Sequence, residues 1–197
     1  MPVEEYGKKD PQTIGLRNVE TGKNYAPVIS TNGGLWRYLL GDTIQFTTLY
    51  PFRIKVSGRL KHFINAFGEE VIVDNTDKAV SIACEKTGAI VNDHTAAPVY
   101  FSDVGNGAHE WLVEFDKEPD NLNKFTVELD KALQSINSDY EAKRYKDIAL
   151  HLPLLHKMPK GLFNEWLKSK GKLGGQHKVP RLSNERTLIE EILQFKI

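Results

Sequence analysis

An α+β fold is predicted by the way in which the sequence pattern changes along the chain. Residues 1–58 contain short strand-like runs separated by glycine and asparagine turns, without helical periodicity. Residues 59–197 mix such runs with segments in which apolar residues recur every three or four positions. We therefore expect a short all-β N-terminal segment and then a small mixed-sheet α/β sandwich domain. Its element order, β-α-β-β-α-α-β-α, favours helices on one side of the sheet.

The N-terminal segment is expected to begin with a β-hairpin over residues 13–31 that turns near Gly22. Residues 35–48 are typical of a long strand that is interrupted at Gly41 and Asp42, and residues 52–57 of another strand. A glycine inside a strand often marks a bulge or the close approach of another backbone. Because little in this segment closes its sheet, we do not expect residues 1–58 to be a complete domain.

The second part, residues 59–197, is expected to start with a helix that Asp74 and Asn75 cap and that runs to Thr87. Three strands follow, over residues 89–93, 97–103 and 110–116. In the last of them Trp111, Val113 and Phe115 share one face. The remaining elements are expected to be helices over 121–136, 139–145, 162–170 and 183–195, and a strand over 148–155.

Composition excludes several classes of partner. The 26 basic and 26 acidic residues give the 197-residue chain zero net charge, which argues against a nucleic acid or an anionic membrane as the main partner. The six histidines do not stand at ligand spacing with cysteine or carboxylate motifs, so no metal site is expected. The single Cys84, with no signal peptide or long apolar run, indicates the cytoplasm.

Two charged places in the first half of the chain are candidate functional residues, each with an ordinary alternative. Residues 38–42 form either a strand that meets a bulge or a site where the Asp42 carboxylate accepts two hydroxyls, as from a ribose. Arg59 and Lys61 stand at the expected domain boundary. They are either a solvated pair or a hinge whose charges exchange partners when the domains rotate.

A cationic, glycine-rich loop precedes the last expected helix. It contains Lys170, Lys172, Lys178 and Arg181. A solvated loop is one reading of this composition. A mobile cation that reaches a phosphate is the other, although the loop has no P-loop pattern.

Five motifs in order along the chain resemble one known family. They lie at residues 4–7, 22–25, 34–38 with Gly41 and Asp42, 58–70 and 176–181. Together they are similar to the auxin-responsive promoter family of acyl acid-amido synthetases, in the form of its bacterial members. The family belongs to the adenylate-forming superfamily, which has a large N-terminal domain and a small mobile C-terminal domain. The resemblance makes residues 1–58 the tail of the large-domain barrel and residues 59–197 the small domain.

The resemblance implies ATP, with Mg²⁺ in the full-length enzyme, as cofactor, and a carboxylic acid and an amine acceptor such as an amino acid as substrates. It implies that Asp42 binds the ribose hydroxyls, with Tyr38 and Gly41 in the same motif, although the usual arginine is Leu39 here. It also implies that Arg59 and Lys61 form the hinge. Lys178 resembles the catalytic lysine that enters the site during one half-reaction.

Two departures from the family limit this transfer. Glu69 or Glu70 stands where plant members place a phosphate-contacting lysine, so that role is not carried over. The Ser/Thr/Gly-rich phosphate loop of the large domain has no counterpart in these residues. The chain therefore resembles the C-terminal part of such an enzyme, and we expect it to be inactive by itself.

A second hypothesis is a non-enzymatic module that binds a partner. In that case the α+β domain has been kept without its catalytic half. The N-terminal strands would then offer an exposed sheet edge, and the chain could form a homo-oligomer through it.

Overall fold

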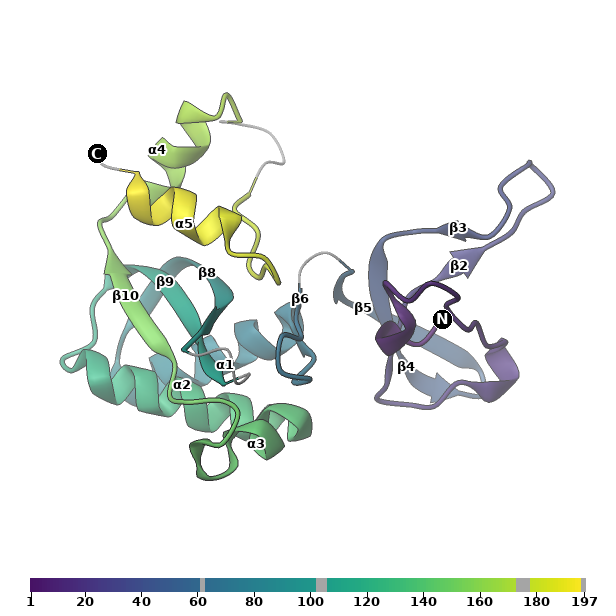
Figure 1. Cartoon of the computed structure of the whole chain (residues 1–197), viewed down its shortest axis with the longest axis horizontal. Coiled ribbons are helices and arrows are strands. Elements are labelled where there is room, and N and C mark those ends of the chain that lie inside the picture. The colour runs from purple at the N-terminus through teal and green to yellow at the C-terminus, as the bar shows by residue number, and fades with distance from the viewer. Residues whose placement is uncertain (61–62, 102–105, 173–177, 196–197) are drawn as a thin grey trace. The chain divides into compact units, whose positions relative to one another are not determined.

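The computed structural model describes residues 1–60, 63–101, 106–172 and 178–195. The chain divides into two compact units, Met1–Lys61 and His62–Ile197 (Figure 1). The sequence placed the division between residues 58 and 59, three residues earlier. Each unit is described by itself below.

The first unit is built from short strands around a small apolar core. Strand β4 (Asp42–Leu49) lies between β1 (Asn24–Tyr25) and β5 (Phe52–Arg59), and β2 (Val28–Ile29) pairs with β3 (Tyr38–Leu39). The strand interruption predicted at Gly41 is confirmed, because β3 ends at Leu39 and β4 begins at Asp42. Two 3-10 turns, Val3–Glu5 and Leu16–Asn18, complete the unit, whose core consists of Met1, Val3, Ala26 and Leu60.

The hairpin predicted over residues 13–31 is wrong. Leu16–Asn18 forms a turn instead of a strand, and β1 pairs with β4 rather than with residues 13–19. Pro27 separates β1 from β2 and has no backbone N–H to give to a sheet. The two short strands therefore pair with two different partners.

The second unit contains a mixed sheet in the order β10-β9-β8. Strand β8 (Ile90–Tyr100) is antiparallel to β9 (Gly107–Lys117), and β10 (Leu154–Met158) is parallel to β9. A separate pair, β6 (Phe63–Ile64) and β7 (Val71–Ile72), precedes the first helix. The sequence predicted two strands where β8 is one. His94 and Thr95, which lie between the two predicted ranges, are buried within the continuous strand.

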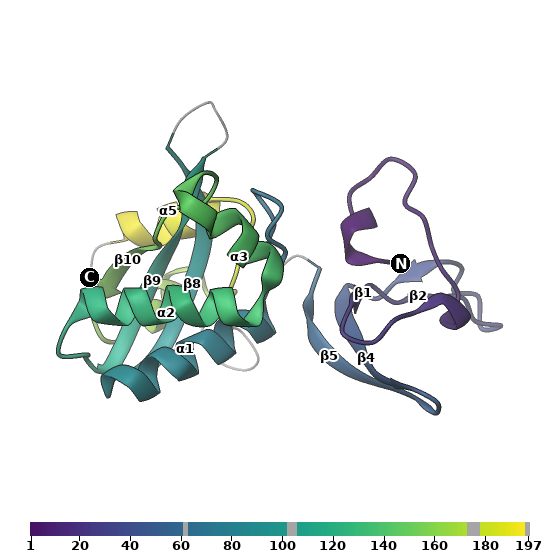
Figure 2. The same cartoon turned by 90° about the horizontal axis from the view of Figure 1, so that it is seen from below.

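One face of this sheet is covered by α1 (Val73–Thr87) and α2 (Leu122–Ile136), with α3 (Ser138–Arg144) after them (Figures 1 and 2). Trp111, Val113 and Phe115 of β9 pack here in one apolar cluster with the helices. The helix predicted over 121–136 was expected to carry an apolar stripe, of which Phe125, Leu129, Ala132 and Leu133 are buried in the same cluster and Ile136 is partly buried against it. The apolar periodicity of these two elements was therefore interpreted correctly.

The opposite face is covered by α4 (Leu162–Ser169) and α5 (Thr187–Gln194) (Figures 1 and 2). Leu112 of β9 packs with Phe163, Trp166 and Ile189 in a second cluster. The prediction of helices on only one side of the sheet is therefore wrong, although the mixed α/β sandwich itself is confirmed. The physical reason is that this face contains Glu110 and Glu114, whose charges made it resemble a solvent-facing surface.

Two element boundaries in the C-terminal third also differ from the prediction. The strand expected at 148–155 is β10 at Leu154–Met158, and the last helix begins at Thr187 rather than near Ser183. The Ser183 hydroxyl accepts the Glu185 N–H in a local turn, at 3.1 Å, instead of capping the helix. In the described part of the chain, no helix has the length and apolar composition that a membrane span requires.

Candidate functional site

The geometry around Asp42 is set by the passage from β3 to β4. Gly41 has a φ of +87°, a conformation that favours glycine, and this lets the chain turn between the two strands. The Gly41 carbonyl accepts the Leu60 N–H at 2.9 Å. Asp42 then stands opposite Arg59 in the β4–β5 register, with 3.5 Å between Asp42 Oδ1 and Arg59 Nε.

The Asp42 side chain is accessible to a ligand. It is 50% exposed, Arg59 is 69% exposed, and Tyr38 on the neighbouring β3 is also exposed. The next residue of β4, Thr43, is buried, and its hydroxyl accepts a hydrogen bond from the buried Ser57 of β5 at 3.1 Å. The β4–β5 pairing has a register shift at the next position along β4, between Thr43 and Ile44. A carboxylate on a fixed backbone and open to solvent fits a ribose, because it can accept two hydroxyl hydrogen bonds.

The predicted hinge is described only in part. Arg59 is the last residue of β5 and pairs with Asp42. Lys61 lies outside the described residues. The hinge role of both residues therefore stays a prediction.

Lys178 lies at the start of a segment that runs along the edge of β8 in the second unit. Within this segment Val179 is buried against the α4–α5 cluster. Ala96 of β8 donates its N–H to the Arg181 carbonyl and accepts the Ser183 N–H, both at 3.0 Å. These parallel contacts fix the segment to the sheet, while the Lys178 side chain is exposed. The predicted site residues therefore fall into two groups, with Tyr38, Gly41, Asp42 and Arg59 together in the first unit.

A charged cluster beside Lys178 was not predicted from the sequence. The Arg181 guanidinium donates to the Asp93 carboxylate and, at 3.2 Å, to the His94 carbonyl, and it lies 3.9 Å from Asp77. Burial raises the pKa of Asp77 and lowers that of Arg181, and each group partly opposes the shift of the other. Asp93 and Asp77 lie 88 residues or more from Arg181 in the sequence, so no local sequence pattern could predict this cluster.

Glu69 has a structural environment. Its side chain is fully buried, and it accepts the Phe67 N–H at 2.7 Å and lies 2.8 Å from His109 Nε2. His109 is buried as well, and Phe67 is partly buried against the apolar cluster. This observation agrees with leaving the phosphate-contacting role of the plant lysine unassigned at this position.

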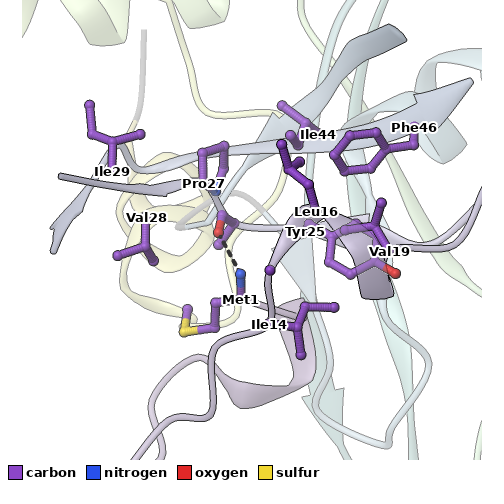
Figure 3. Close-up of a pocket in the computed structure, with 12 residues that line it drawn as sticks. Met1, Ile14, Leu16, Val19, Tyr25, Pro27, Val28, Ile29, Ile44 and Phe46 are labelled. Carbon is purple, nitrogen blue, oxygen red and sulfur yellow. Dashed lines mark hydrogen bonds between the residues drawn. The ribbon is translucent and has the colours of Figure 1, made fainter. Parts of the chain in front are cut away.

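An apolar pocket of about 390 Å³ lies in the first unit (Figure 3). The Met1 ammonium at its wall donates to the Ala26 carbonyl at 3.1 Å. The Tyr25 hydroxyl, also at the wall, accepts the Glu20 N–H at 2.9 Å. The other lining side chains are apolar, from Ile14, Leu16, Val19, Pro27, Val28, Ile29, Ile44 and Phe46. Such a lining accepts an apolar group, and the Tyr25 hydroxyl is the polar side-chain group among the lining residues.

We assign no residue to a metal site and no nucleophilic role to the Cys84 thiol. In the ranges that the structure describes, no three His, Cys, Asp or Glu side chains are grouped to hold a metal ion, so none is assigned to Mg²⁺. Burial raises the pKa of the Cys84 thiol. A thiol of that kind is a weak nucleophile at neutral pH.

Both units correspond to known domains. Residues 1–59 match the GH3 family central domain, and residues 74–187 match the GH3 family C-terminal domain. The chain therefore belongs to the GH3 family. This confirms the resemblance to acyl acid-amido synthetases, while the likeness to bacterial members stays a prediction.

Individual relatives cover nearly the whole chain. A jasmonoyl–L-amino acid synthetase, GH3.5, of Oryza sativa subsp. japonica is 30% identical over 91% of this chain and 31% of its own length. The solved structure of the GH3.15 acyl acid amido synthetase superposes with a TM-score of 0.68 at 22% identity, over 93% of this chain and 34% of that one. A 2-hydroxyisobutyryl-CoA ligase, solved in a postadenylation state with an acyl-AMP compound, gives 0.50 at 14% identity, over 89% and 35%. The chain thus spans about a third of the length of these proteins.

Proposed function

We propose that this chain is the C-terminal portion of an ATP-dependent acyl-adenylate-forming ligase, which joins a carboxylic acid to an amine such as an amino acid. The observation that carries the proposal is the match to two consecutive domains of one synthetase family, in order and over most of the chain. In this proposal the first unit is the tail of the large adenylation domain, and the second is the small mobile domain.

Asp42 is the proposed ribose-binding residue. Its half-exposed carboxylate stands at the strand turn that Gly41 makes, next to the exposed Tyr38. The Arg59 Nε atom lies 3.5 Å from one carboxylate oxygen, a separation longer than a strong charge-assisted hydrogen bond. Ribose hydroxyls can therefore compete for this carboxylate.

Lys178 is the proposed catalytic cation. It is exposed at the end of a segment that is fixed to β8. An ammonium brought to a phosphate would stabilise the negative charge that develops during transfer. Rotation of the small domain about Arg59 and Lys61 would exchange the geometries of adenylation and transfer. Phosphate and Mg²⁺ contacts would come mainly from a preceding part of the full-length enzyme.

The purified chain should catalyse no acid-dependent exchange of pyrophosphate into ATP, because these residues have no counterpart of the phosphate loop. A chimera in which residues 1–197 replace the matching third of the rice jasmonoyl–amino acid synthetase should catalyse it. Radioactive pyrophosphate exchange measures both. Exchange by the chain alone would contradict its inactivity, and a folded but silent chimera would contradict the ligase function.

Asp42→Asn in the same chimera tests the proposed ribose contact, with Asp10→Asn as its matched control. It keeps the size of the side chain but removes its charge. The loss of a charge-assisted hydrogen bond should raise the KM for ATP by about tenfold or more. Asp10→Asn, an exposed carboxylate change in the same unit, should leave the KM unchanged.

A second candidate function is the partner-binding module, and one observation favours it. Strand β5 is at the edge of its sheet and exposes Phe52, Ile54 and Val56, the last of them by 69%. An exposed apolar edge strand is a template for pairing with another chain. The same side chains would equally be covered by the rest of a large domain.

Light scattering on the purified chain separates the two candidates. For a severed enzyme domain we expect a monomer at low concentration, with association that grows as the concentration rises. A discrete oligomer whose mass stays constant on dilution would favour the module instead. Ile54→Lys, which places a charge on the exposed edge, should abolish association in either case.

A further inference from the structure

Two carboxylates face the segment that carries Lys178. Asp93 belongs to β8 and Asp77 to α1, and both lie next to the Arg181 guanidinium. Among the described residues, no carboxylate forms an ion pair with Lys178, which precedes Arg181 by three positions. Arg181 is therefore the cation that lies next to both acids, and Lys178 stands three residues before it.

The strand register brings Lys178 within reach of the same acids. The segment runs parallel to β8, with Leu182 level with Ala96. Thr95 Oγ1 donates to the carbonyl of Pro180, two residues after Lys178, at 2.7 Å, so the parallel course of the segment leads Lys178 toward the Asp93 end of β8. A flexible lysine side chain that starts there can turn back toward Asp93 if the carboxylate is unoccupied.

We propose that Arg181 is a positioning residue for Lys178, because it occupies Asp93 and Asp77 and so keeps them from capturing the Lys178 ammonium. This inference rests on the catalytic role proposed above for Lys178. Arg181 suits the task because its planar fork donates to the Asp93 carboxylate and to the His94 carbonyl together. A captured Lys178 would be unable to leave the sheet edge for a phosphate.

The backbone already fixes the segment without the Arg181 side chain. Thr95 Oγ1 donates to the Pro180 carbonyl at 2.7 Å, and Ala96 makes its two backbone bonds to Arg181 and Ser183. Val179 is buried below them. A change at Arg181 that removes only its charge should therefore leave the segment in place and expose the role of the guanidinium.

Competitive amine labelling tests the inference on the whole chain, without nucleotide. Trace acetic anhydride is added to the native protein, and mass spectrometry gives the acetylation rate of Lys178 relative to Lys168, a 62% exposed lysine on α4. In Arg181→Gln the relative rate at Lys178 should fall about threefold or more, because the ammonium becomes ion-paired. Adding Asp93→Asn to that variant should restore the rate, and Arg181→Lys should keep it near the wild-type value.

The opposite result has a distinct meaning. If Arg181 only held the segment in place, its loss would loosen the chain, and the rate at Lys178 would rise. A rise, or no change, in Arg181→Gln would overturn the inference. Since labelling involves neither ATP nor an acid, such a failure would leave the ligase proposal to be judged by the chimera alone.

Discussion

Replacement of Asp130 by alanine should destabilise the second unit by about 3–5 kcal/mol, the cost typical of breaking a buried ion pair. Asp130 is 4% exposed on α2. One carboxylate oxygen accepts the Tyr140 hydroxyl at 2.8 Å and Arg144 Nε at 2.7 Å. The other accepts Arg144 Nη2 at 3.0 Å and Gln134 Nε2 at 2.8 Å. Its removal leaves a guanidinium and a hydroxyl without their main acceptor in the protein interior.

The Tyr140 hydroxyl strengthens this argument. Burial, together with the negative charge of Asp130, raises the pKa of Tyr140 well above its usual value. The phenol therefore stays protonated and remains a donor at neutral pH. Without Asp130, a fully buried donor would have to find water or remain unsatisfied, which costs about 1–3 kcal/mol by itself.

Urea unfolding of the whole chain measures the effect. Trp36 is 81% exposed in the first unit, so a Trp36→Phe background leaves Trp111 and Trp166 as fluorescent reporters of the second. Lys131→Ala, a neighbouring surface change, should cost under about 0.5 kcal/mol. A cost below about 1 kcal/mol for Asp130→Ala would contradict the prediction. In Asp130→Leu with Arg144→Leu, the combined cost should be smaller than the sum of the single ones.

This network also shows where the sequence was informative and where it was not. The apolar stripe of α2 was predicted because periodicity is a local property, and Leu129 and Leu133 are buried as expected. Asp130 stands between them and has the composition of a surface residue. Its partners Tyr140 and Arg144 follow a turn of the chain, and only the packing of α3 against α2 brings them inward. A buried charge cannot be distinguished from a solvated one before its partners are placed.

In the candidate site, too, some residues could be predicted from local sequence and others could not. Gly41 and Asp42 are neighbours, so the turn and its carboxylate could be predicted from five residues of sequence. Arg181 was predicted only as part of a cationic loop. Its contacts with Asp93 and Asp77 depend on how residues 178–183 run beside β8, which no local pattern records. The charges of Glu110 and Glu114 concealed the second helical face for a related reason, since their partners, which include Asn92, Gly161 and Arg186, lie between 22 and 76 residues away.

Acidification should weaken the second unit through His94. Its side chain is only 4% exposed, and burial lowers its pKa from 6.5 to about 4. The ring stacks on Trp111 with 5.6 Å between centroids, and its Nε2 atom has no hydrogen-bond partner among the described residues. Neutral imidazole fits this environment, whereas the imidazolium would be a desolvated charge.

The sign of the pH effect follows from the two states. Near pH 7.5 His94 is neutral in the folded and the unfolded chain, so it adds no pH dependence. Below about pH 6.5, His94 binds a proton in the unfolded chain but not in the folded chain. The free energy of unfolding therefore falls as the pH falls. The fall ends near pH 4, where the folded form is protonated as well. Each tenfold difference in proton affinity is worth about 1.4 kcal/mol, so the total loss is about 3 kcal/mol.

His94→Phe isolates this contribution, because phenylalanine can keep the stacking on Trp111 but does not titrate. We expect the variant to lose about 3 kcal/mol less free energy of unfolding than the wild type between pH 7.5 and pH 4.5, in urea unfolding followed by Trp fluorescence.

Asp77, whose Oδ1 lies 3.8 Å from His94 Nε2, acts in the opposite direction. Burial raises its pKa, so its folded form binds a proton more readily than its unfolded form. Asp77→Asn should therefore steepen the loss on acidification, and equal pH dependence of the wild type and His94→Phe would contradict the assignment to His94.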